Sequence, residues 1–256
     1  SSLNKTEDDV EIRKNDIITG RYAVLVRQSQ LLPESSGQPI KIEGYQFSAD
    51  EQKILIETEV EKIWRRSTKA HYYVYDLQDE TLTKLTDSDL KQQFAEFSPQ
   101  GNRVGFVRNN NLFWVDLSTG REYQITSDGK ERHIINGASD WVYEEEFSFA
   151  KAWFWGPDGN KIAFYRFDES RVKQYTLQEW DDIYPDNISY KYPKAGEQNA
   201  IVDIGVHQLK KDTTVWMDHG DTDNAYIVRL DWTHDSNKLA IRRMNRLQNR
   251  QDLMLA

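Results

Sequence analysis

Cysteine is absent from the 256 residues, which excludes disulfide bonds and thiolate metal sites. The five histidines lie far apart, without the spacing of a ligand set, so we expect neither a metal nor a cofactor. No apolar run approaches the roughly 18 residues that a membrane-spanning helix needs. Basic residues are outnumbered, and the net charge of −9 argues against a nucleic-acid partner, which would require clustered Lys and Arg.

Aromatic residues, by contrast, make up 12% of the chain, and one short pattern built on them occurs four times. In each copy an apolar segment ends at an aromatic residue, a polar turn follows, and a basic residue opens a second apolar segment. Gly105, Ala163 and Ala240 occupy matching places in the second segment, which predicts close approach of neighbouring sheets. The four copies are Phe47–Ile56, Phe97–Phe106, Trp155–Phe164 and Trp232–Ile241.

A further hairpin pattern follows the first two copies, at Tyr72–Thr86 and Leu112–Thr126, so each unit should contain four strands. Four-stranded units that repeat along a chain are typical of a β-propeller. We therefore predict an all-β fold of about four to five four-stranded antiparallel blades, with inserted loops and a short helix. The ends look cut, and we expect residues 1–256 to be a propeller fragment of a longer chain.

Two segments outside the repeats receive their own predictions. Residues 1–9 are polar and are expected to fray. Val202–Trp232 is interpreted as one extended hairpin, with its bend at Gln208–Asn224.

The stretch Asp140–Phe147 has three consecutive glutamates between aromatic residues. Aromatic side chains favour burial whereas adjacent carboxylates repel and favour water, so the stretch should lie where a packed wall meets a cavity. Two of the three carboxylates could hold an ammonium group. The alternative is a solvated face, or the acidic first turn of a helix.

The stretch Asp140–Phe147 resembles a segment of the amino-terminal propeller of the dipeptidyl peptidase IV family of serine peptidases. Further matching segments are Trp64–Ser67, Tyr192–Asn199 and Arg243–Asn249. The resemblance implies that Glu145 and Glu146 hold the free amino terminus of a peptide substrate. It also implies that Arg65 binds a substrate carbonyl oxygen and supports the glutamate pair. Trp141 and Tyr143 should pack as wall, and Glu144 should face elsewhere.

Members of this family release dipeptides with Pro or Ala second, but no credible nucleophile lies in this chain. We therefore expect no catalytic residue here, and an α/β-hydrolase domain beyond Ala256. The resemblance further implies a homodimer, with Val202–Trp232 as its arm, and export to the periplasm or surface of a bacterium. Two alternatives stay open: a related tripeptidyl peptidase or endopeptidase, and a binding propeller without catalysis.

Overall fold

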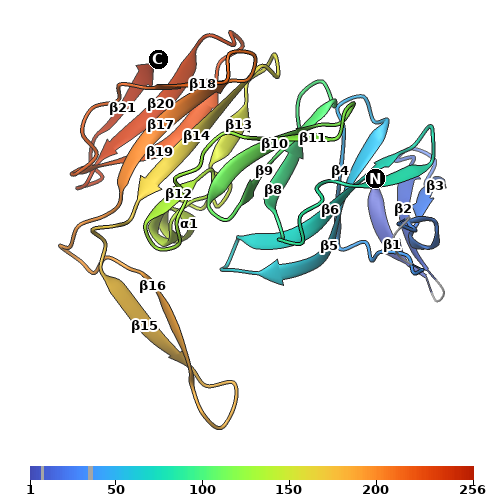
Figure 1. The fold of residues 1–256 in the computed structure, drawn as a ribbon, viewed down its shortest axis with the longest axis horizontal. Coiled ribbons are helices and arrows are strands. Elements are labelled where there is room, and N and C mark those ends of the chain that lie inside the picture. The colour runs from blue at the N-terminus through green and yellow to red at the C-terminus, as the bar shows by residue number, and fades with distance from the viewer. Residues whose placement is uncertain (7–8, 34–36) are drawn as a thin grey trace.

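The computed structural model describes residues 1–6, 9–33 and 37–256, which form six antiparallel sheets of two to five strands. Five of the sheets follow one another in chain order as the blades of a partial β-propeller (Figure 1). This confirms the predicted fold class. The described helices are one α-helix and the 3-10 helix η1 (Gln28–Gln30), and neither is long and apolar enough to cross a membrane.

The first two repeats form complete four-stranded blades, with strand orders β4-β5-β6-β7 and β11-β10-β9-β8. In each blade the first two strands are the predicted aromatic-turn repeat and the last two are the predicted second hairpin. The strands are β4 (Gly44–Phe47), β5 (Lys53–Lys62), β6 (Thr68–Asp76), β7 (Thr81–Lys84), β8 (Gln93–Phe97), β9 (Arg103–Arg108), β10 (Asn111–Asp116) and β11 (Arg121–Gln124).

The third blade differs because its first strand is split. Both β12 and β13 pair with the same strand, β14, and the short helix α1 (Trp141–Glu146) lies between them in sequence. β14 then pairs with β17, and β17 with β18. The strands of this blade are β12 (Ile134–Asn136), β13 (Trp153–Trp155), β14 (Lys161–Asp168), β17 (Ile201–Gln208) and β18 (Thr213–Trp216).

The prediction of an extended hairpin at Val202–Trp232 is wrong. β17 is a largely buried strand of the third blade, whereas Tyr226–Trp232 pairs in the next sheet. The projecting arm is instead formed by β15 (Gln174–Glu179) and β16 (Asp186–Lys191), a separate two-stranded sheet that extends away from the blades (Figure 1). Every residue of β15 is exposed, whereas Ile188–Lys191 of β16 are half-buried.

The first and last sheets each contain three strands among the described residues. β1 pairs with β2, so residues 2–5 form a sheet edge, and the prediction that this segment frays is wrong for them. Residues 7 and 8, which the same prediction included, lie outside the described residues. The strands are β1 (Ser2–Lys5), β2 (Val10–Asn15), β3 (Tyr22–Arg27), β19 (Ala225–Trp232), β20 (Leu239–Asn245) and β21 (Gln251–Leu255).

A repeated hydrogen bond links neighbouring blades through the aromatic residue of the repeat. The indole N–H of Trp155 donates to the backbone oxygen of Glu96 (3.2 Å), which directly precedes the repeat aromatic of the blade before. The indole N–H of Trp232 donates in the same way to the oxygen of Phe154 (3.1 Å). Trp at this place therefore packs as an apolar side chain and also satisfies a backbone carbonyl of the adjacent blade.

Candidate functional site

The insertion in the third blade closes on itself at its base. An isolated bridge joins Ala138 to Lys151, and the backbone of Tyr165 on β14 bonds to both sides of the insertion. The amide of Gly137 donates to the Tyr165 oxygen (3.0 Å), and the Tyr165 amide donates to the Ala152 oxygen (2.9 Å). The intervening residues therefore leave the sheet edge and return to it, carrying α1 on a short, fixed base.

Asp140 begins the helix as its N-cap, with its carboxylate accepting a hydrogen bond from the Tyr143 amide (2.9 Å). At the other end the Phe147 amide donates to the Tyr143 oxygen (3.2 Å). Burial of the whole side chain raises the pKa of Asp140 to about 7. Burial and the nearby Asp140 raise the pKa of Glu169, which follows β14, to about 8.

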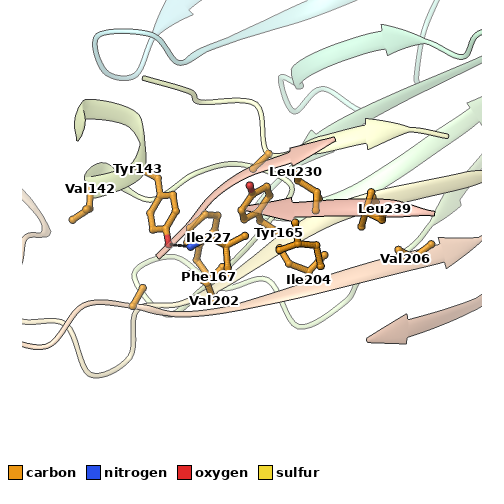
Figure 2. Packing of buried hydrophobic residues seen from close by; sticks show 14 of the residues in the cluster. Val142, Tyr143, Tyr165, Phe167, Val202, Ile204, Val206, Ile227, Leu230 and Leu239 are labelled. Atoms are coloured by element: carbon orange, nitrogen blue, oxygen red, sulfur yellow. Dashed lines mark hydrogen bonds between the residues drawn. The ribbon is translucent and has the colours of Figure 1, made fainter. Parts of the chain in front are cut away.

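Val142 and Tyr143 fix one face of α1 to the largest hydrophobic cluster (Figure 2). Tyr143 is fully buried, and its ring lies 4.9 Å from that of Phe167 on β14, centroid to centroid. Its hydroxyl oxygen accepts a hydrogen bond from the amide of Ile227 on β19 (3.0 Å). Tyr143 therefore joins the helix to two sheets, in the packing role predicted for it.

The three glutamates point in different directions, because successive helical residues turn by about 100° around the axis. Glu144 is buried at 2% exposure, the Glu145 side chain is 19% exposed, and Glu146 is exposed. Glu145 and Glu146 also lie at the carboxyl end of the helix, where the backbone dipole is negative. This end of α1 is consequently a favourable place for a cation.

Arg65 reaches the helix from the turn between β5 and β6, in a different blade. Its Nε donates to Oε2 of Glu145 at 2.8 Å, although the two residues are 80 positions apart in sequence. The neighbouring Arg66 donates from Nη2 to the Ser148 hydroxyl (3.2 Å). The structure thus brings two of the three predicted site residues into direct contact.

The third predicted residue, Glu146, makes no ion pair among the residues that the structure describes. The negative charge of Glu145 is therefore already balanced by Arg65, while that of the adjacent Glu146 is not. This arrangement can accept an ammonium group through charge-assisted hydrogen bonds. The ammonium role of the pair and its enclosure in a cavity stay predictions.

Aromatic side chains gather beside this helix, a feature that sequence reasoning missed. The Trp64 ring lies 5.1 Å from that of Tyr190 on β16, and the Trp141 ring lies 4.5 Å from that of Tyr192. They come from three separate segments, so no periodic pattern could have revealed them. A cavity of about 500 Å³ adjoins them and is lined by Trp141, Tyr175, Tyr190, Tyr192, Lys194 and Ala195.

Comparison with known proteins agrees with this architecture. The sequence matches the model of the family described as "Dipeptidyl peptidase IV (DPP IV) N-terminal region" over residues 48–256. The chain belongs to this family. The predicted family resemblance is thereby confirmed, and the DPP IV N-terminal region covers all of the site described above.

Individual relatives of this DPP IV region show the same relationship. The chain is 35% identical to a "probable dipeptidyl-aminopeptidase B" of Tuber melanosporum, over 93% of this chain and 28% of that protein. It is 33% identical to mouse "Prolyl endopeptidase FAP", over 79% of this chain and 26% of that protein. The crystal structure of Porphyromonas gingivalis dipeptidyl peptidase 4 superposes with a TM-score of 0.88 and 31% identity, covering 99% of this chain and 37% of the other. The chain thus spans well under half of each relative's length.

Proposed function

We propose that this chain is the substrate-gating propeller of a serine exopeptidase that releases Xaa-Pro and Xaa-Ala dipeptides. In this proposal Glu145 and Glu146 hold the free amino terminus of the peptide, and Arg65 supports them and binds a substrate carbonyl oxygen. A separate α/β-hydrolase domain supplies the catalytic groups. The observation that carries the proposal is the contact of Arg65 with Glu145 beside the uncompensated Glu146.

The chemistry follows from charge and position. An ammonium group has three N–H donors, and two carboxylates at the negative end of a helix can accept them. Because the amino terminus is held at a fixed point, only a bond at a fixed distance along the peptide can reach the nucleophile. The same geometry that binds the peptide would therefore set the length of the product.

The experiment compares Glu145→Gln and Glu146→Gln in the intact protein, using a Gly-Pro chromogenic substrate. Each change removes one charge-assisted interaction, so we expect kcat/KM to fall by roughly 10–100-fold. Glu131→Gln serves as the control, because Glu131 is an exposed glutamate outside α1. Unchanged kcat/KM in both site variants, or equal cleavage of an N-acylated substrate, would refute the amino-terminus anchor.

A second candidate function is internal cleavage or release of a longer product. The mouse relative carries the name of an endopeptidase at nearly the same identity as the aminopeptidases, which favours keeping this candidate. Masses of the products from a long peptide separate the cases: dipeptides support the proposal, tripeptides or internal fragments the alternative. No cleavage by the intact protein would indicate a binding propeller.

The exposed arm suits association with a second copy of the chain. Trp180 is 66% exposed and Ile183 and Tyr184 are each 84% exposed, so the tip of the β15–β16 hairpin presents large apolar side chains to solvent. Burying them against a partner would be favourable. We place the homodimer arm at this hairpin, and propose an exported protein of the bacterial periplasm or cell surface.

A further inference from the structure

The first glutamate of the triplet has a partner that the substrate proposal does not use. Glu144 is buried, and its Oε1 accepts two backbone hydrogen bonds, from the amide of Arg66 (2.6 Å) and from that of Ser67 (3.0 Å). Both donors lie in the turn that carries Arg65. We infer that Glu144 is a positioning residue that fixes this turn on α1, so that Arg65 meets Glu145; the inference rests on the proposed function.

The turn needs such support because it lies beyond the regular part of its blade. The β5–β6 ladder has a register shift between Thr58 and Glu61, and Glu59 within it adopts a positive φ of 54°. Only the pairs of Glu61 and Lys62 with β6 lie between this bulge and the turn. A bulge bends a hairpin and lets its tip change direction. Figure 1 shows the tip of the hairpin extending from its blade toward α1.

The ion pair of Arg65 with Glu145 is too weak to hold the turn by itself. The Arg65 side chain is 70% exposed, and an ion pair with an exposed partner contributes little because water and salt screen it. Glu144 differs, since it is buried and accepts hydrogen bonds from two backbone amides of the turn. Hydrogen bonds to a buried carboxylate are among the stronger ones in proteins. Of the two glutamate contacts, the backbone contact of Glu144 is therefore the one that fixes the turn on α1, and the ion pair of Arg65 follows from it.

The consequence for catalysis is preorganisation. With the turn fixed, Arg65 already lies beside Glu145 before a peptide arrives. Without it, ordering the turn would cost entropy at each binding event. Loss of Glu144 should therefore weaken binding of the peptide's amino-terminal part, and appear mainly in KM.

The test is a series at position 144 in the intact protein. Both amides bond to a single oxygen, so Glu144→Gln keeps an acceptor in place but loses its charge. We therefore expect kcat/KM to fall on the order of threefold, clearly less than in Glu144→Ala. Glu144→Ala removes the acceptor and Glu144→Asp withdraws it, so both should lose roughly 10–100-fold, mostly through a raised KM. Ser148→Ala is the matched control, because it removes only the Arg66 side-chain contact and should change kcat/KM little.

A double-mutant cycle separates positioning from general damage. If Glu144 acts through Arg65, adding Glu144→Ala to Arg65→Ala should lower kcat/KM by no more than about twofold. The inference would be overturned if Glu144→Ala lowered kcat/KM by the same factor in the parent and in Arg65→Ala. It would also be overturned if Glu144→Gln lowered kcat/KM as much as Glu144→Ala does. Should Glu144→Ala fail to fold, the contrast of Glu144→Asp with Glu144→Gln still decides. If Glu145→Gln is impaired while Glu144→Ala is not, only this inference fails. If Glu145→Gln and Glu146→Gln are both unaffected, the proposed function itself fails.

Discussion

Gly105 provides a sharp test of how the blades pack. It lies on β9, and a Cβ added to it would lie 2.6 Å from Cη2 and 2.8 Å from Cζ3 of Trp153 in the next blade. It would also lie 3.3 Å from Cζ2 of Trp155. Trp153 is fully buried, so its ring has no free space to enter. The expectation that a small residue is needed at this place is therefore supported by direct contacts.

We predict that Gly105→Ala destabilises the protein by about 1–3 kcal/mol, the usual cost of forcing an extra carbon into a packed core. The direction is informative, because Ala in place of Gly within a regular strand would otherwise stabilise by roughly 0.5–1 kcal/mol. For a domain of this size, each kcal/mol lowers the melting temperature by about 2–4 °C. A fall of roughly 2–12 °C is expected.

The assay is thermal unfolding of the intact protein, followed by tryptophan fluorescence. Gly37→Ala is the matched control, because Gly37 has nothing within 4 Å of its added Cβ and no positive φ. Trp153→Phe removes the two closest ring atoms, so the double variant Gly105→Ala/Trp153→Phe should lose less than the sum of the single changes. A melting temperature for Gly105→Ala equal to or above that of the parent would refute the packing argument.

Two further predictions concern the base of α1 and the arm. Burial raises the pKa of Asp140 from 3.8 to about 7, so the folded protein holds this proton more tightly than the unfolded chain does. The stability that this protonation gives is fully present below about pH 4 and is lost as the pH rises through about 7. Asp140→Asn keeps an N-cap but does not titrate, so it should remove a pH-dependent free energy of unfolding on the order of a few kcal/mol between about pH 4 and 7. The melting temperature of the variant should therefore vary less with pH over this range than that of the parent; an equal pH dependence in both proteins would contradict the prediction. The double variant Trp180→Ser/Tyr184→Ser should be a monomer by light scattering, whereas the control Trp216→Ser, on exposed β18, should remain a dimer. A double variant that is still a dimer would show that the β15–β16 hairpin is not the dimer contact.

The repeats could be predicted because they follow local rules. An aromatic residue, a tight turn and a basic residue recur at fixed places, and the turns use positive φ at the same position, Gly101 (67°) and Gly159 (63°). The arm was misplaced for a physical reason. β17 is apolar because it is a buried blade strand, whereas β15 is exposed throughout although its Tyr175 and Leu177 alternate with polar residues. Alternation over so few residues does not distinguish a projecting hairpin from a half-buried blade strand.

The candidate site was less accessible to such rules. The involvement of Arg65 came from a family resemblance, since a contact between residues 80 positions apart leaves no periodic trace. Helical geometry predicts that Glu144 points away from Glu145 and Glu146, but it does not predict which groups Glu144 contacts. They are backbone amides, which every residue except proline possesses, so no side-chain pattern identifies them.

The geometry of the site depends on how the blades are placed relative to one another. Arg65 comes from the β4–β7 blade, and Glu145 comes from the insertion between β12 and β13 in the third blade. A tilt of either blade would therefore separate the two atoms that are 2.8 Å apart. The complete blade between them is β8–β11, and it is linked to the blade of α1 by the Trp155 hydrogen bond to Glu96 and by the close contact of Gly105 with Trp153. Substitutions in these contacts should therefore disturb the contact of Arg65 with Glu145 without involving either residue. The close packing of neighbouring blades thus serves the site as well as the core, because it allows only small changes in blade angle.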